Sequence, residues 1–394
     1  MQQEFIGFDS INYLKPALSQ CKGRKIFLVT GKNSFKTSGA ERILKPFITG
    51  FGIVHFIYNE PNPKIEDIER GIEIFKTQNP DVVVAVGGGS VIDSAKLISF
   101  FGANNIKPQD WLLEEKPKIE KKIPLLAIPT TSGSGSEATP FAVLYVCKEK
   151  YSVEHETMLP DFAIVDPSFT MNLPRYITAT SGIDALSQAI ESYWSIHSTD
   201  ESKILAAKAI KLIHKNIINA VNKPAPDIRL AMAEGAHFAG KAIRLTRTTA
   251  VHAVSYPITS YFGIPHGHAC GLVLPSMFHY IAGVTSDDIA DKRGRHYLIN
   301  TLNEIAFLLG EQNHKNVPNI LAILLKEIGL ETDFNVLGIK SKEDIETIIT
   351  YGFNPARVKN NPRILSKRTL RHLLNKASAT PCHHRRKIRP KSSE

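Results

Sequence analysis

The sequence has few cysteines, no long apolar run and no recognisable secretory signal, and each absence excludes a class of protein. Among its 394 residues the cysteines are Cys21, Cys147, Cys270 and Cys382. They form no C-x-x-C pair, so reduced cytosolic thiols fit them better than a disulfide framework. No apolar run reaches the roughly 18 residues that a membrane span needs. Residues 1–5 carry neither the basic nor the apolar part of a signal peptide. We therefore expect a cytoplasmic protein without a membrane partner.

The net charge is positive but unevenly distributed. The chain has 48 basic and 38 acidic residues, a formal net charge of +10, and residues 385–394 hold five basic residues against one acidic residue. A charge gathered in a terminal tail is typical of a solvated extension rather than of a folded nucleic-acid-binding face. We expect no nucleic-acid partner and predict a basic, disordered tail over residues 377–394.

The first part of the chain alternates strand-like and helix-like segments. Runs of β-branched and apolar residues that predict buried strands cover residues 25–30, 53–58, 82–86 and 123–128. A helical pattern covers residues 65–77. Strands separated by helices indicate a parallel, Rossmann-like sheet, so we predict an α/β domain over residues 1–167.

The second part lacks strand-like runs. Helical periodicity covers residues 183–195, 202–214, 228–242 and 298–309. We predict an all-α domain over residues 168–376, entered through the turn-rich segment 159–168. A chain of this length is too long for one ordinary core, which agrees with two domains.

Two polar loops follow strands of the predicted sheet. Val86 leads into the glycine-rich turn 87–90 and then into a helix, an arrangement that favours a bound phosphate. After a later strand, residues 130–136 hold five hydroxyl side chains and two glycines. Either loop alone is equally consistent with a plain turn or a flexible loop. Together they favour a dinucleotide site.

Potential metal ligands occur in the second part. Asp184 and Gln188 are four residues apart and so share a helix face. His252 and His266 follow, fourteen residues apart. One carboxylate and two imidazoles suit a divalent ion such as Zn²⁺ or Fe²⁺. A single histidine is more often a core or surface residue, and spacing alone does not decide between the two.

Five motifs resemble signatures of the iron-containing (group III) alcohol dehydrogenases, in the family's order and spacing. They cover residues 86–96, 129–137, 166–167, 182–191 and 265–267. The resemblance implies a dehydroquinate synthase-like fold, with a dinucleotide-binding domain, a helical metal-binding domain and catalysis between them. It implies an NAD(P)-dependent oxidoreductase acting on a small alcohol or aldehyde. By analogy it also implies a homo-oligomer, a dimer or larger.

The resemblance also assigns residues. The implied metal ligands are Asp184, His252 and His266, the last also a catalytic residue. The implied contacts to NAD(H) or NADP(H) are Gly87, Gly88, Gly89, Ser90, Asp93, Thr130, Thr131, Ser136 and Lys150.

Three positions depart from the family pattern. Gln188 stands where the family usually has a histidine ligand, so it is a weak ligand or none, and the metal's identity stays open. Tyr256 replaces a second cleft histidine and either donates a proton or shapes the pocket. Gly31 replaces an acidic residue that binds the adenosine ribose, and Lys32 follows it, which predicts acceptance of NADPH.

The segment before His252 suggests a substrate. Lys241, Arg244 and Arg247 precede it, and such cations can hold an anionic head group, although a solvated helix face explains them as well. Residues 188–195 and 248–257 resemble the phosphonoacetaldehyde reductase branch of the family. That branch implies reduction of phosphonoacetaldehyde to 2-hydroxyethylphosphonate. The alternatives are a butanol-type dehydrogenase with an uncharged substrate and an inactive nucleotide- or metal-binding sensor.

Overall fold

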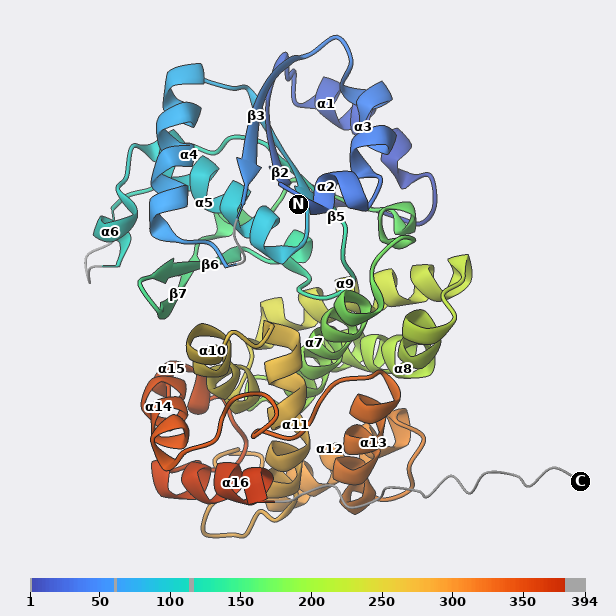
Figure 1. Ribbon diagram of the computed structural model, residues 1–394, viewed down its shortest axis with the longest axis vertical. Helices are drawn as coiled ribbons and strands as arrows, with labels where there is room; N and C mark the ends of the chain where they lie inside the picture. Colours follow the sequence, from blue (N-terminus) through green and yellow to red (C-terminus); the bar gives the residue numbers. More distant parts are fainter. Residues whose placement is uncertain (1, 60–61, 113–116, 380–394) are drawn as a thin grey trace, which may run out of the picture.

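The computed structural model describes residues 2–59, 62–112 and 117–379. An α/β domain and a helical domain lie one above the other in Figure 1. The last strand of the α/β domain ends at Val165, and the first long helix of the helical domain begins at Arg175. The predicted fold class is confirmed.

The α/β domain is built on a six-stranded parallel sheet. Its order is β1-β8-β5-β4-β2-β3. The strands are β1 (Gln3–Ile6), β2 (Lys25–Gly31), β3 (Gly52–Tyr58), β4 (Val82–Gly87), β5 (Leu125–Pro129) and β8 (Phe162–Val165). The accompanying helices are α1 (Leu14–Gln20), α2 (Ser34–Thr37), α3 (Ala40–Ile48), α4 (Ile65–Gln78), α5 (Gly89–Asn104) and α6 (Pro108–Trp111).

Strand periodicity explains why helices cover both faces of this sheet. Successive side chains of a strand point to opposite faces. In β2, Phe27 and Val29 pack in the core formed with α4 and α5. Ile26 and Leu28 pack in a separate core with α1 and α3. Because both faces are buried, the strand reads as a continuous apolar run.

A β-hairpin leaves the sheet and reaches the helical domain. It consists of antiparallel β6 (Phe141–Val146) and β7 (Glu149–Glu154). Neither this hairpin nor the short strands β1 and β8 were predicted from sequence patterns. The hairpin matters for the site because it carries Lys150 between the two domains.

The helical domain contains no named strand within the described residues. Its helices are α7 (Arg175–Trp194), α8 (Asp200–Asn222), α9 (Pro226–Thr246), α10 (Ala250–Phe262), α11 (His266–Ala282), α12 (Arg295–Leu308), α13 (Val317–Glu327), α14 (Lys342–Gly352), α15 (Pro355–Val358) and α16 (Lys367–Ala379). None of the helices described is long and apolar enough to cross a membrane.

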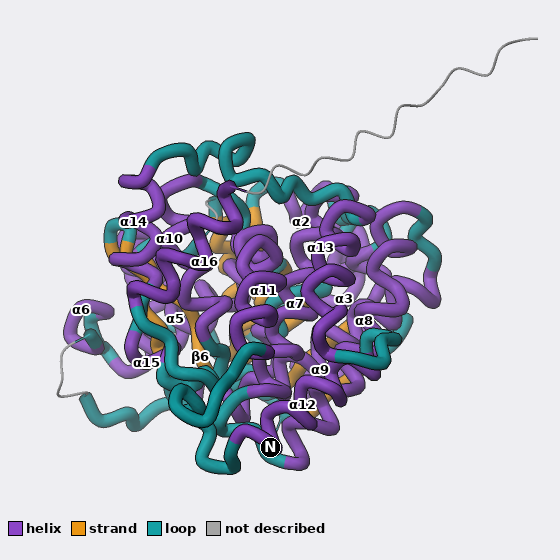
Figure 2. The backbone as a smooth tube through the Cα atoms, turned by 90° about the horizontal axis from the view of Figure 1, so that it is seen from below, coloured by secondary structure: helices purple, strands orange, loops and turns teal. Residues whose placement is uncertain are grey.

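Helix α7 forms the centre of this domain. Every residue from Gly182 to Trp194 is buried, and Figure 2 shows α7 and α11 in the middle of the surrounding helices. A helix that is buried on all sides must pair its polar side chains internally. Asp184, Gln188 and Glu191 of α7 therefore require partners inside the protein.

The predicted elements agree with the structure except at their ends. The four predicted strands correspond to β2, β3, β4 and β5, and the predicted helices lie within or overlap α4, α7, α8, α9 and α12. The predicted tail is corrected at its start: residues 377–379 belong to α16, whose helical pattern continues to Ala379. The remainder of the predicted tail, 380–394, lies outside the described residues.

Candidate active site

The two polar loops meet at the carboxyl edge of the sheet. β4 and β5 are adjacent, and Gly87 pairs with Pro129 at their ends. Gly88 precedes α5, which begins at Gly89. Because α5 spans sixteen residues, the free N–H groups of its first turn and its dipole make this edge a suitable anion site.

Buried charges fix the loop of hydroxyl residues. Asp93 accepts hydrogen bonds from the Ser136 hydroxyl and from the Val143 backbone N–H. Nζ of the fully buried Lys96 donates to the Ser136 hydroxyl at 3.0 Å and to the Thr139 carbonyl oxygen at 2.8 Å. Burial lowers the pKa of Lys96 to about 8. These contacts hold the loop against α5 and the hairpin.

The hydroxyl loop also contacts the helical domain. A Cβ at Gly135 would lie 2.5 Å from the Cα of Gly240 in α9, so both positions require glycine for this approach. The contact places the carboxyl edge of the sheet, with its two polar loops, against the helical domain.

Three donor atoms converge where α7, α10 and α11 meet. Asp184 lies on α7, His252 on α10, and His266 begins α11. Nε2 of His252 lies 3.4 Å from Oδ1 of Asp184, and Nε2 of His266 lies 3.8 Å from the same oxygen. Helix α11 approaches α7 this closely because residue 267 is glycine: a Cβ there would collide with the Thr180 carbonyl oxygen.

Contacts to the Nδ1 atoms of His252 and His266 orient both imidazole rings. The Nδ1 atom of His252 contacts the fully buried Glu191 carboxylate. Glu191 also accepts hydrogen bonds from the backbone N–H groups of Thr249 at 3.0 Å and Val251 at 2.9 Å. Nδ1 of His266 lies 3.3 Å from the Ser255 hydroxyl. Such partners leave Nε2 of each ring free to face a metal ion.

The residues present fit a divalent metal ion. Oδ1 of Asp184, Oε1 of Gln188 and Nε2 of His252 are buried and have no hydrogen-bond partner among the described residues. Each unpaired buried polar atom costs about 1–3 kcal/mol, which a shared cation removes. The structure thus brings together all three implied ligands and also places Gln188 at their pocket.

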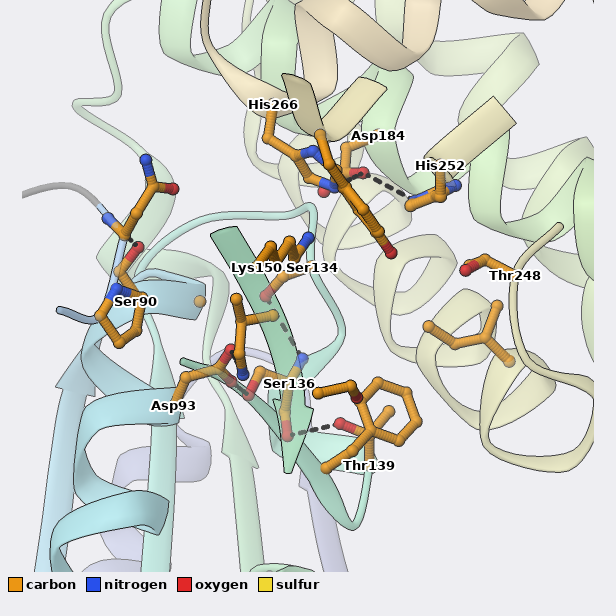
Figure 3. A pocket seen from close by; sticks show the side chains of 18 of the residues that line it. Ser90, Asp93, Ser134, Ser136, Thr139, Lys150, Asp184, Thr248, His252 and His266 are labelled. Atoms are coloured by element: carbon orange, nitrogen blue, oxygen red, sulfur yellow. Dashed lines mark hydrogen bonds and ion pairs between the residues drawn. The ribbon is translucent and has the colours of Figure 1, made fainter. Parts of the chain in front are cut away.

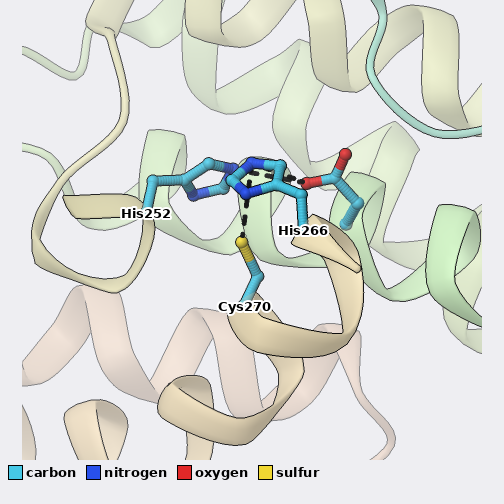
Figure 4. A group of neighbouring side chains, drawn as sticks. His252, His266 and Cys270 are labelled. Carbon is cyan, nitrogen blue, oxygen red and sulfur yellow. Dashed lines mark hydrogen bonds and ion pairs between the residues drawn. The ribbon is translucent and has the colours of Figure 1, made fainter. Parts of the chain in front are cut away.

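Sequence reasoning missed a fourth candidate ligand, Cys270. Its Sγ lies 3.9 Å from Nε2 of His266, and ligand atoms of the two histidines, Asp184 and Cys270 lie within 4.8 Å of one another. Figure 4 shows His252, His266 and Cys270 side by side. The available signal was the spacing of four residues from His266, which puts both on one face of α11.

Tyr256 and Lys150 line the pocket beside the donor atoms. The Tyr256 ring stacks on His266, with centroids 5.7 Å apart, and Lys150 Nζ lies 3.6 Å from the centre of the Tyr256 ring. Burial alone would raise the pKa of Tyr256. The positive charges on Lys150, Arg357 and His252 outweigh burial and lower that pKa.

One pocket between the domains collects many of the predicted cofactor and metal residues, as Figure 3 shows for those it labels. The predicted residues lining it are Gly89, Ser90, Asp93, Ser136, Lys150, Asp184, Gln188, His252, Tyr256 and His266. The predicted residues that do not line it are Gly31, Lys32, Gly87, Gly88, Thr130, Thr131, Lys241, Arg244 and Arg247.

The three cations predicted to bind the substrate do not line this pocket, which corrects their predicted placement. Nζ of Lys241 lies 2.8 Å from the Glu4 carboxylate, and the Arg244 guanidinium lies 3.6 Å from Glu156. Arg247 pairs with Glu154 in a groove that adjoins the pocket. All three therefore pair with carboxylates of the α/β domain: one in β1, one at the end of β7 and one just after it.

A buried histidine bridges the domains beside Lys241. His237 of α9 has its Nδ1 3.1 Å from Glu137 and its Nε2 3.4 Å from Glu4. Burial alone would lower the pKa of His237, but the two carboxylates outweigh burial and raise it to about 9. The contact with His237 lowers the pKa of Glu4 to about 2, against the opposing effect of burial.

These shifts predict how the interdomain contact depends on pH. The stabilisation from His237 is complete below its ordinary pKa of 6.5 and is lost as the pH rises through about 9. The stabilisation from Glu4 is complete above its ordinary pKa of 4.5 and is lost as the pH falls through about 2. We expect thermal melts to show a fall in Tm between pH 6.5 and 9 that is smaller in His237→Gln. Equal falls in both proteins would contradict this assignment.

Comparisons with known proteins agree with this geometry. Residues 2–167 match the family model "Iron-containing alcohol dehydrogenase", and residues 178–378 match "Fe-containing alcohol dehydrogenase family, C-terminal". The long-chain-alcohol dehydrogenase 1 of Geobacillus thermodenitrificans is 34% identical over 291 residues, 73% of each chain. The phosphonoacetaldehyde reductase of Streptomyces viridochromogenes is 34% identical over 312 residues, 76% of each chain.

A solved structure is similar over nearly the whole chain. It is the sulfoacetaldehyde reductase of Bifidobacterium kashiwanohense in complex with NAD⁺, with a TM-score of 0.85 and 30% sequence identity. The alignment covers 96% of this chain and 98% of that one.

Proposed function

The chain belongs to the iron-containing alcohol dehydrogenase family, and we propose that this member reduces phosphonoacetaldehyde to 2-hydroxyethylphosphonate with NADPH. The family makes it a metal-dependent, NAD(P)-linked alcohol dehydrogenase or aldehyde reductase. The substrate and the choice of NADPH are the parts that we add.

One observation carries the reaction type. Three unpaired or weakly paired donor atoms, from Asp184, His252 and His266, face the same pocket as Gly89 and Ser90 at the start of α5. A metal site and a phosphate-binding helix terminus within one pocket suit hydride transfer between a dinucleotide and a small carbonyl compound.

The side chains of the pocket have distinct tasks. Asp184, His252 and His266 would hold a divalent ion, which would supply Lewis-acid polarisation of a carbonyl oxygen when bound, and bound NADPH would be the hydride donor. The α5 N-terminus and the loop fixed by Lys96 orient the cofactor. Tyr256 carries the proton that the product alcohol needs, and Lys150 lies against its ring.

Two observations support an anionic aldehyde and NADPH. The relatives named above include enzymes for phosphonoacetaldehyde and sulfoacetaldehyde, short aldehydes that each carry a strongly acidic group. At the adenosine end, β2 ends in Gly31 rather than in a carboxylate, and the exposed Lys32 follows it. A lysine here can pair with the 2′-phosphate of NADPH, whereas an acidic residue would repel it.

An assay of reduced-cofactor oxidation tests the proposal directly. Metal-reconstituted protein is supplied with phosphonoacetaldehyde, butanal or lactaldehyde, each with NADPH and with NADH. A charge-assisted hydrogen bond contributes about 1.5–3 kcal/mol, so we expect kcat/KM for phosphonoacetaldehyde to exceed that for butanal by about 10- to 100-fold. Equal activity on butanal would favour the butanol-type alternative. Absence of hydride transfer with every aldehyde would favour the sensor.

A further inference from the structure

The pocket contains a second cation that no sequence motif covers. Arg357 lies on α15 and lines the pocket together with Lys150 and Tyr256. It also lines the adjoining groove that holds Arg247. The arginine therefore lies where the pocket continues from the metal end toward the outside.

Arg357 has no acidic partner among the described residues, unlike the three predicted substrate-binding cations. Lys241, Arg244 and Arg247 each pair with a glutamate of the α/β domain. Within residues 2–59, 62–112 and 117–379, no carboxylate lies within ion-pair distance of the Arg357 guanidinium. An unpaired arginine in a pocket is available for a ligand.

The local charges show which part of the pocket Arg357 influences. Its positive charge contributes to lowering the pKa of Tyr256 and, after burial, that of Arg247. Arg357 therefore lies close enough to Tyr256 in the pocket and to Arg247 in the groove for its charge to affect both side chains. Lys150 acts on Tyr256 as well, so two cations flank this side of the pocket.

We propose that Arg357 binds the oxyanion head group of the substrate, while the substrate's carbonyl group lies at the Asp184–His252–His266 end. The guanidinium presents paired N–H donors that match two oxygens of a phosphonate or a sulfonate. This arrangement makes α15 the element that selects a charged aldehyde over an uncharged one. The inference rests on the proposed reduction of an anionic aldehyde.

Substitutions at position 357 test this role. Arg357→Gln is expected to lower kcat/KM for phosphonoacetaldehyde by about 10- to 100-fold, mainly through KM, and Arg357→Lys should recover part of it. Activity on butanal should change by less than about threefold, because an uncharged chain makes no such bond. A parallel assay with sulfoacetaldehyde shows whether the site prefers a phosphonate or a sulfonate head group. Arg368→Gln, the same change at an exposed arginine of α16 outside the pocket, is the matched control and should leave both substrates unaffected.

A binding measurement separates this inference from the proposed reaction. Calorimetric titration with 2-hydroxyethylphosphonate should show binding to the wild-type protein that is weakened in Arg357→Gln but retained in Arg368→Gln. Binding of this kind without turnover of phosphonoacetaldehyde would support the anion site and contradict the reaction. Turnover that is equal in Arg357→Gln and Arg368→Gln would overturn the anion site and leave the reaction standing. Parallel losses on butanal and phosphonoacetaldehyde would also overturn it, since they indicate general damage to the pocket.

Discussion

Asp184→Asn protein is expected to purify without its divalent metal and to lose roughly 10³-fold or more in kcat. The substitution keeps the shape of the side chain but removes the one negative charge among the three implied ligands. Oδ1 of Asp184 lies within 3.4 and 3.8 Å of the Nε2 atoms of the two histidines, so a single cation can contact all three atoms. Without the carboxylate, two neutral imidazoles and an amide bind a dication much more weakly.

Metal content and thermal stability provide the readout for Asp184→Asn. Elemental analysis should find metal in the wild type and in Asp227→Asn, an exposed aspartate of α9 that serves as control. Added Zn²⁺ should raise the Tm of the wild type but not that of Asp184→Asn, because only a bound ligand stabilises the folded state. A normal metal content in Asp184→Asn would show that the ion is held elsewhere.

The sequence predicted those parts of the fold that local patterns determine. Residues 25–30 form β2 because an apolar run can bury both faces of a parallel strand. β1 and β8 have four residues each, too few for a pattern to stand out, and they pair with each other although about 155 residues separate them. The hairpin of β6 and β7 was also missed, since its half-buried strands alternate only partly.

Site residues that belong to sequence motifs were predicted, whereas those brought to the site only by tertiary contacts were missed. Asp184, His252 and His266 were identified and do converge. The prediction for Lys241 and Arg244 assumed that residues shortly before His252 in the sequence line the same pocket as its side chain. Both lie on α9 and His252 on α10, with Arg247 between the helices in a left-handed conformation, so the chain changes direction there. Arg357 lies about 90 residues beyond His266, and no spacing rule connects the two.

Loss of Glu191 should damage both the stability of the fold and metal binding. It is fully buried, contacts Nδ1 of His252, and accepts hydrogen bonds from Thr249 and Val251 at the start of α10. Glu191→Ala removes the only described acceptor of these backbone N–H groups. Breaking a buried charged network costs about 3–5 kcal/mol, which lowers Tm by roughly 6–20 °C in a domain of this size.

The Glu191→Gln substitution separates the effect of Glu191 on the orientation of His252 from its effect on folding. The amide oxygen can still accept from the backbone of Thr249 and Val251, so Tm should fall much less than in Glu191→Ala. The amide cannot support His252 as a carboxylate does, so metal affinity should drop by about 10- to 100-fold. Competition with a chelator measures that affinity, and Glu201→Ala, at an exposed glutamate of α8, serves as control. If Glu191→Gln binds metal as tightly as the wild type, Glu191 serves the fold alone and His252 is oriented by the packing of α10 against α11.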